Sequence, residues 1–235
     1  IVGQNNGTIT GATWTSSGKY GNALYFDGNG DYVNLGTPSS LCSDIFTVEF
    51  WMKGETQIKD HPAIISKIDS SDRGFKFSLS TTTTDFLVFH IGEGPSYGTE
   101  RISINSINSG PILDNTWHHI IGTYNGSAIS LYVDGALVNN ITWNKYSCIT
   151  SNVMYLGVDN YDVNNRQYKG YIDEVRIYNR VLNADEVSFN YMSNFYKYNS
   201  SNWVLEVNKT DLAVGAYNYS VSFIYQCYMR YLQIN

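Results

Sequence analysis

The sequence predicts an all-β fold, and three observations lead to that prediction. Aromatic residues make up 15% of the 235 residues, and Tyr, Phe and Trp favour pleated, half-buried surfaces. Apolar and polar residues alternate in many short runs that are separated by turn residues. Strands do not alternate with helices along the chain. Together these features predict a two-sheet antiparallel jelly-roll sandwich with one short helix and a C-terminal β tail.

The predicted strands follow one another from residue 23 to residue 178. The clearest region is an antiparallel meander over 117–143, because its Asn125-Gly126 and Asp134-Gly135 turns suit hairpins whose central residues need positive φ. Other strands are predicted at 46–52, 63–68, 74–79, 86–91, 154–158 and 170–178. A short helix follows, since Asn183 can cap it and Glu186 completes a capping box.

The charge of the chain excludes some classes of partner. Only 15% of the residues are charged and the net charge is −6, which argues against nucleic acid and against an anionic membrane surface. No apolar run approaches the roughly 18 residues of a membrane span, so no membrane insertion is expected.

Low Lys content, many uncharged polar residues and the glycosylation sequons indicate an extracellular or cell-surface location. The chain begins at Ile1, so either a signal segment has been removed or the chain is part of something longer. Of the sequons, Asn125 is the best candidate because it lies at a predicted hairpin tip. The sequons are Asn6, Asn125, Asn140, Asn199, Asn208 and Asn218.

Three cysteines allow one bridge within the chain. A Cys42–Cys148 disulfide is the preferred pairing, because both residues precede predicted strands and Cys227 lies in a separate tail. Three buried free thiols are an equal alternative.

Five sequence blocks resemble the laminin-G-like, concanavalin-A-like domain family. They lie in the family's order at 18–33, 46–51, 117–126, 131–135 and 170–180. The resemblance covers about residues 1–192, and it implies a jelly-roll domain of secreted or cell-surface proteins that commonly binds glycans or proteins. Some relatives of the fold are glycanases or lyases.

Residues 193–235 form a separate tail. Trp203, Tyr217–Tyr219 and Arg230–Leu232 resemble the latter half of an immunoglobulin-like module. A complete module of that kind needs about 100 residues. We therefore expect a partial module that is completed by the body of the chain or by a neighbouring chain.

No catalytic residues are predicted, so the chain is not expected to be an enzyme. Glycanases of this fold need two carboxylates at i and i+2 or i+4 on one strand face. The nearest candidates, Asp173 and Glu174, are consecutive and should point to opposite faces.

A structural calcium ion is the one cofactor that the sequence suggests. Asp27, Asn29 and Asp31 place three oxygen-bearing side chains in one Gly-rich turn, and calcium prefers such ligands. The resemblance implies that Asp27 and Asp173 would hold the ion together. A tight turn that uses Asn, Asp and Gly for positive φ is the alternative.

A second polar cluster, Asp159-Asn160-Tyr161-Asp162, precedes the last predicted strand of the body. Its polar and aromatic side chains could hold a sugar, although a solvated loop is the more common outcome for such a segment.

Two functions remain open. The first is a non-catalytic extracellular binding or adhesion module for glycans or surface proteins. The second is a structural subunit of an extracellular filament or sheath, in which residues 193–235 self-associate by strand pairing between chains.

Overall fold

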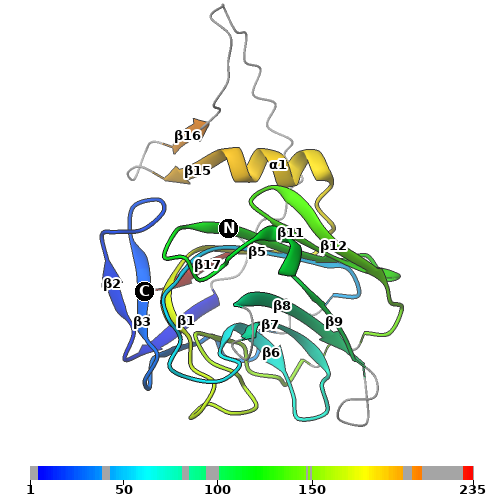
Figure 1. Cartoon of the computed structure of the whole chain (residues 1–235), viewed down its shortest axis with the longest axis horizontal. Coiled ribbons are helices and arrows are strands. Elements are labelled where there is room, and N and C mark those ends of the chain that lie inside the picture. Colours follow the sequence, from blue (N-terminus) through cyan, green and yellow to red (C-terminus); the bar gives the residue numbers. More distant parts are fainter. Residues whose placement is uncertain are drawn as a thin grey trace, which may run out of the picture.

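A computed structural model describes residues 5–38, 43–80, 85–93, 101–146, 148, 150–197, 203–207 and 230–234. Its strands form two sheets that face each other across an apolar core, and an α-helix lies outside one of them (Figure 1). The predicted fold class, an all-β two-sheet antiparallel sandwich with one short helix, is confirmed.

We name the sheets by their position relative to the helix. The helix-side sheet has the order β12–β11–β10–β5–β14–β3–β2 with antiparallel neighbours. Its strands are β12 (Ala136–Thr142), β11 (Ala128–Val133), β10 (His118–Tyr124), β5 (Phe46–Gly54), β14 (Lys169–Tyr178), β3 (Ala23–Asp27) and β2 (Thr13–Thr15).

The far sheet has the order β1–β4–β13–β6–β7–β8–β9, and its neighbours are also antiparallel. Its strands are β1 (Asn5–Thr10), β4 (Tyr32–Asn34), β13 (Tyr155–Leu156), β6 (Ala63–Ile68), β7 (Gly74–Ser80), β8 (Phe86–Gly92) and β9 (Arg101–Asn105), which a short 3-10 helix, η2 (Ile107–Ser109), follows.

The predicted meander is confirmed as β10, β11 and β12, with Asp134 and Gly135 in the positive-φ turn between the last two. The strand predicted at 154–158 is shorter than expected. Strand β13 ends before Gly157, whose φ of 81° takes the backbone out of the extended region.

Aromatic residues of both sheets fill the space between them. The Phe77 and Phe89 rings stack with centroids 4.4 Å apart, and both lie against β10 of the opposite sheet at Gly122. A Cβ atom at Gly122 would lie 2.4 Å from the Phe77 ring, so the absence of a side chain there permits the close approach of the sheets.

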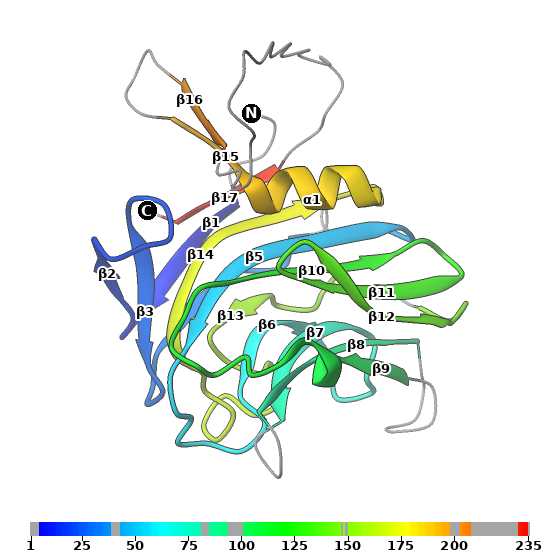
Figure 2. The ribbon, with the colours of Figure 1, turned by 45° about the horizontal axis from the view of Figure 1, so that its top comes forward.

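Helix α1 (Ala184–Met192) packs on the outer face of the helix-side sheet, across β14, β5 and β10 (Figure 2). The predicted capping box is confirmed: Asn183 Oδ1 accepts from the Glu186 N–H, and the Glu186 carboxylate accepts from the Asn183 N–H. Val187 is fully buried against Ile121 and Tyr178 of the sheet.

The tail contributes three described strands. Strands β15 (Ser193–Lys197) and β16 (Trp203–Val207) pair with each other, and β17 (Arg230–Ile234) pairs antiparallel with β14 and parallel with β1. Residues 208–229 lie outside the described part, so the partial immunoglobulin-like module and the domain boundary at residue 192 stay predictions.

Candidate functional site

A buried polar network lies between α1 and the helix-side sheet, and Glu49 is its centre. Its Oε1 accepts from His119 Nε2 at 3.0 Å and from Arg176 at 3.1 Å. Its Oε2 accepts from the Tyr178 hydroxyl at 2.6 Å and from Asn190 Nδ2 of the helix at 3.0 Å. Glu49 therefore ties α1 to three strands, which is a structural role.

Electrostatics fix the charge of Glu49. Burial alone would raise the pKa of its carboxyl, but the hydrogen bond from His119, the Arg176 charge and the Tyr178 hydroxyl outweigh burial and lower the pKa to about 2. A buried carboxylate with four donors has no free lone pair for a ligand or for proton transfer.

An aromatic strip crosses the same outer face beyond the helix. We define it as Tyr25, Tyr171, Lys53 and Trp117. Tyr171 pairs in register with Tyr25 on one side and with Lys53 on the other, and Trp117 directly precedes β10, next to Lys53. Because residues opposite each other on neighbouring strands share a face, these side chains form one row. All four are partly exposed.

The rings of the strip contact one another at an angle. The Tyr25 and Tyr171 centroids lie 4.8 Å apart with planes tilted by 47°, and those of Trp117 and Tyr171 lie 6.1 Å apart. The Lys53 ammonium lies 4.9 Å from the Tyr171 centroid. The strip can therefore offer ring faces and a cation to the same ligand.

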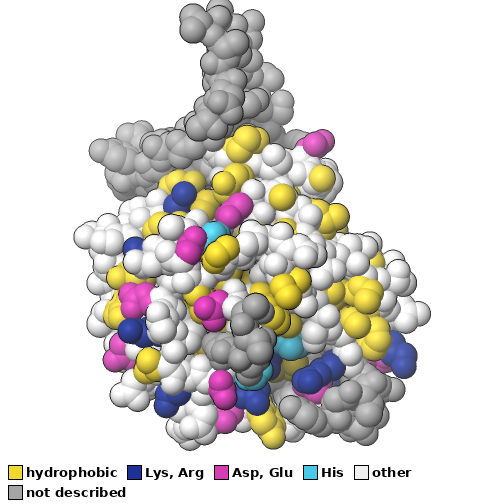
Figure 3. Space-filling view, in the orientation of Figure 1, with side chains coloured by type: hydrophobic (Ala, Val, Ile, Leu, Met, Phe, Trp, Pro, Cys, Tyr) yellow, Lys and Arg dark blue, Asp and Glu magenta, His cyan; other side chains and the backbone are white. Residues whose placement is uncertain are grey.

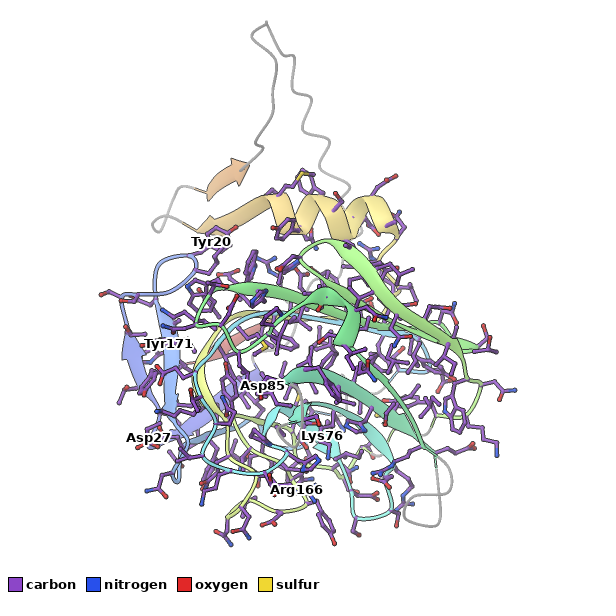
Figure 4. All side chains as sticks on the ribbon, viewed as in Figure 1. Tyr20, Asp27, Lys76, Asp85, Arg166 and Tyr171 are labelled. Carbon is purple, nitrogen blue, oxygen red and sulfur yellow. The ribbon has the colours of Figure 1, made fainter. Side chains whose placement is uncertain are left out.

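The next row toward the helix is more buried. Lys19 lies 4.2 Å above the ring of Trp51, which is itself 2% exposed, and Tyr20 contacts that ring edge-on. Burial lowers the pKa of Lys19, and Asp134 opposes that shift. Tyr20 and Tyr171 are both marked in Figure 4, on the side of the molecule that carries β2 and β3.

The predicted calcium ligands are only partly brought together. Asp27, Asn29 and Asp31 share one turn, in which Asp31 Oδ2 accepts from the Asp27 N–H and Asp27 Oδ1 accepts from the Asn29 N–H. Asp173 is not at this turn. Asp27 lies opposite Lys169, and Asp173 is four positions further along β14, about 13 Å from Lys169. The strand register therefore does not bring Asp173 to the turn that holds Asp27.

Asp173 has a different role. Its carboxylate accepts from the Tyr20 and Glu174 N–H groups and fastens the loop before β3 to β14. Burial raises its pKa to about 6. Calcium at the turn itself stays a prediction, which calorimetric calcium titration of chelator-treated protein would check.

The predicted ligand-binding cluster lies on the outer face of the far sheet. Asp159 is fully buried and pairs with Lys76 at 2.8 Å and with Arg166 at 3.2 Å, and Figure 4 marks these two cations beside each other. Asn160 donates to the Ile68 carbonyl, and Asp162 accepts from Asn165. These contacts fasten the loop to β6 and β7 and to itself.

Tyr161 is the member of the cluster that reaches the surface. Its side chain is 54% exposed, and the Arg166 guanidinium lies 5.7 Å from its ring centroid. A role of the cluster in ligand binding stays a prediction that now rests on Tyr161.

The cysteine and sequon predictions stay open. Cys148 is disulfide-bonded. Cys42 and Cys227 lie outside the described residues, so the Cys42–Cys148 pairing stays a prediction. Asn125 and Asn140 are exposed, and Asn6 belongs to β1. The remaining sequons, Asn199, Asn208 and Asn218, lie outside the described residues.

The described residues do not gather metal ligands in one place. They contain no group of three or more His, Cys, Asp or Glu side chains that could hold a metal ion, and no helix among them is long and apolar enough to cross a membrane. On the face shown in Figure 3, basic and acidic side chains are interspersed.

Residues 27–188 match the family described as the concanavalin A-like lectin/glucanases superfamily, in its laminin G form. The chain belongs to this superfamily. Among curated relatives, pappalysin-1 of Mus musculus is 30% identical over 128 residues, and pappalysin-1 of Homo sapiens is 26% identical over 170 residues. The matches cover 49% and 66% of this chain, but only 8% and 10% of the relatives.

Solved structures of the same fold include binding domains. The binding domain of Paraclostridial Mosquitocidal Protein 1 matches with a TM-score of 0.62 at 21% identity. The match covers 79% of this chain and 46% of the chain in that structure. Domain 4 of AbnA, an extracellular arabinanase of Geobacillus stearothermophilus solved with arabinotriose, has a TM-score of 0.59 at 22% identity. That match covers 77% of this chain and 86% of the domain. At these identities the likeness shows the fold.

Sequence reasoning did not identify the aromatic strip. Tyr25, Tyr171 and Trp117 lie in three separate blocks, and only strand register brings them into one row. The sequence did hold a signal for it: in these segments an aromatic residue occupies a position that alternation assigns to the outward face of the sheet.

Proposed function

We propose that the chain is a non-catalytic extracellular module that binds a glycan on the aromatic strip of the helix-side sheet. The observation that carries this proposal is the row of three partly exposed rings, Tyr25, Tyr171 and Trp117, beside the Lys53 ammonium. Aromatic faces supply contact area at low conformational cost, and nearby polar groups orient the ligand.

The fold neighbours support a binding role. One of them is named as a binding domain, and the other was solved with arabinotriose. Laminin G-like domains occur in secreted and cell-surface proteins, which is consistent with an extracellular location.

Two buried carboxylates, Glu49 and Asp159, are engaged in structural contacts, which supports a role without catalysis. Glu49 is fully buried with four donors on it, and Asp159 is buried between two cations. A glycosidase needs one carboxylate that can carry a proton and another that can reach the sugar. Neither residue is placed for such a step.

The proposal is tested with an array of immobilised glycans, followed by titration calorimetry on the glycans that bind. We expect Tyr171→Ala and Trp117→Ala each to weaken binding about tenfold, since an aromatic contact contributes about 1–1.5 kcal/mol. Tyr161→Ala is the matched control, because it removes an exposed ring from the opposite sheet. Thermal unfolding verifies that each variant is folded.

Two results would contradict the proposal. Loss of binding in Tyr161→Ala with Tyr171→Ala unaffected would move the site to the far sheet. The absence of binding to any glycan on the array would remove the glycan function itself.

A structural subunit of an extracellular filament or sheath is the second candidate function. The observation that favours it is the pairing of β17 with the edges of β14 and β1, because an edge that accepts a strand of its own chain can accept the same strand from a neighbour.

A further inference from the structure

Lys53 of β5 and Lys19, in the loop between β2 and β3, face aromatic rings, and neither has a carboxylate partner among the described residues. Lys53 lies 4.9 Å from the Tyr171 centroid, and Lys19 lies 4.2 Å from the Trp51 centroid. Within the described part of the chain, neither ammonium forms an ion pair. Both side chains are partly exposed, so a ligand on the strip can reach them.

The acidic groups around these lysines are engaged elsewhere. Glu55 pairs with Lys169 at 3.3 Å. The Asp134 carboxylate contacts the His118 ring and accepts from the His119 N–H. The Asp173 carboxylate accepts two backbone N–H groups. Neither lysine therefore has a direct ion pair with these groups, and Asp134 acts on Lys19 only through space. Both ammonium groups remain available to an external anion.

The spacing of the two cations suits a ligand with repeated charges. Trp51 and Lys53 are two residues apart on β5 and point to the same face, which separates their positions by about 7 Å along the strand. Lys19 lies over the Trp51 row and Lys53 lies in the aromatic strip. A ligand that crosses both rows meets a cation in each.

We propose, on the basis of the glycan-binding function above, that the ligand of the strip is an acidic glycan. Its sugar rings contact Tyr25, Tyr171 and Trp117, and its carboxylate or sulfate groups pair with Lys53 and Lys19. The net charge of −6 disfavours non-specific attraction of polyanions. If the protein binds an acidic glycan selectively, the selectivity therefore comes from contacts at the strip and not from the overall charge of the chain.

The test compares acidic and neutral probes that share a backbone. The probes are an oligogalacturonate of defined length and its carboxyl-reduced neutral counterpart, with dextran sulfate and dextran as the sulfate pair. Binding is measured by titration calorimetry at low and at physiological salt. The variants are Lys53→Gln and Lys19→Gln, and the matched control is Lys145→Gln, an exposed lysine that follows β12.

We expect the acidic member of at least one pair to bind about tenfold more tightly than its neutral partner. Lys53→Gln and Lys19→Gln should each lower the affinity for that acidic ligand about fivefold or more and change the affinity for the neutral ligand by less than twofold. Lys145→Gln should change neither. Added salt should reduce the preference for the acidic ligand. Preference for the oligogalacturonate or for dextran sulfate identifies the anionic group.

Three results would overturn the inference. Equal binding of acidic and neutral partners would remove the acidic specificity and leave the glycan function in place. Acidic binding that persists in both lysine variants would place the anion elsewhere. Failure of every glycan on the array and of all four probes would remove the proposed function together with the inference.

Discussion

At the scale of single residues, Glu49 shows how one buried charge organises a surface. Three strands and α1 each supply a donor to its carboxylate or carry the carboxylate itself. A charge in this position is costly unless each lone pair is occupied, and here each carboxylate oxygen has two donors. The helix is thereby held over the sheet in one position.

This arrangement predicts a pH-dependent loss of stability in Glu49→Gln. The folded-state pKa of about 2 lies below the usual value of 4.5, so the carboxylate stabilises the fold above pH 4.5, and that contribution is lost as the pH falls toward 2. At pH 7 we expect the variant to lose about 3–5 kcal/mol of unfolding free energy, measured by denaturant titration. Near pH 2 the two proteins should converge.

The control is Glu55→Gln, which removes a partly exposed carboxylate paired with Lys169. It should cost less than about 1 kcal/mol, because exposed ion pairs contribute little. A Glu49→Gln protein as stable as this control at pH 7 would show that the network does not hold the helix.

At the scale of elements, α1 depends on its first turn. The helix is 9 residues long, too short to be stable by itself, and its capping box fixes the end that follows β14. Asp185 and Glu186 in that turn also favour the positive end of the helix dipole. The cap therefore sets where the helix begins over the Glu49 network.

We expect Asn183→Ala to lower the unfolding free energy by about 1 kcal/mol, because the Glu186 N–H loses its acceptor. Asp185→Ala is the comparison, since Asp185 lies in the same turn but is not one of the two capping-box residues, and its loss should cost a few tenths of a kcal/mol. Denaturant unfolding followed by Trp fluorescence measures both. Equal losses of unfolding free energy in the two variants would show that the first turn stabilises the helix only through its charge.

The elements that depend on residues close together in the sequence could be predicted. The features that depend on which residues pair between strands could not. The meander and α1 follow from turn pairs and a capping box, both of which act within a few residues. In β14 a bulge between Asp173 and Arg176, with Glu174 at φ 50°, interrupts the alternation that the sequence suggested. The bulge lets Arg176 contact both Glu49 and Glu174, an arrangement that no local pattern encodes.

The same limit applies to the candidate site. The turn at Asp27–Asp31 could be predicted because its residues are adjacent in sequence. The separation of Asp173 from that turn, and the meeting of Tyr25, Tyr171 and Trp117, depend on which residues pair between β3, β14 and β5. An error of one residue in the register moves a strand by about 3.3 Å and turns each of its side chains to the other face of the sheet.

At the scale of the whole molecule, the two ends of the described chain meet at one place. Strand β17 pairs with Arg176 and Ile177 of β14 and runs beside Asn5–Gly7 of β1. It therefore connects the helix-side sheet to the far sheet, as Figure 1 shows for the label β17 between β1 and β5. A strand in this position closes two edges that would otherwise be open.

Deleting residues 230–235 tests whether this closure is made within one chain or between chains. A binding module that closes its own edges should be a monomer of 26.5 kDa by light scattering, at every concentration, and the deletion should lower its melting temperature without changing its mass. A synthetic peptide of residues 228–235 should restore part of the lost stability by pairing with the open edges.

Ordered filaments of the full chain that vanish on deletion would instead assign the strand to a neighbour, since an exchanged strand holds chains together and its loss releases them. Because the aromatic strip contains no residue of β17, a glycan that binds the strip in the full chain should also bind the shortened protein, which separates assembly from recognition.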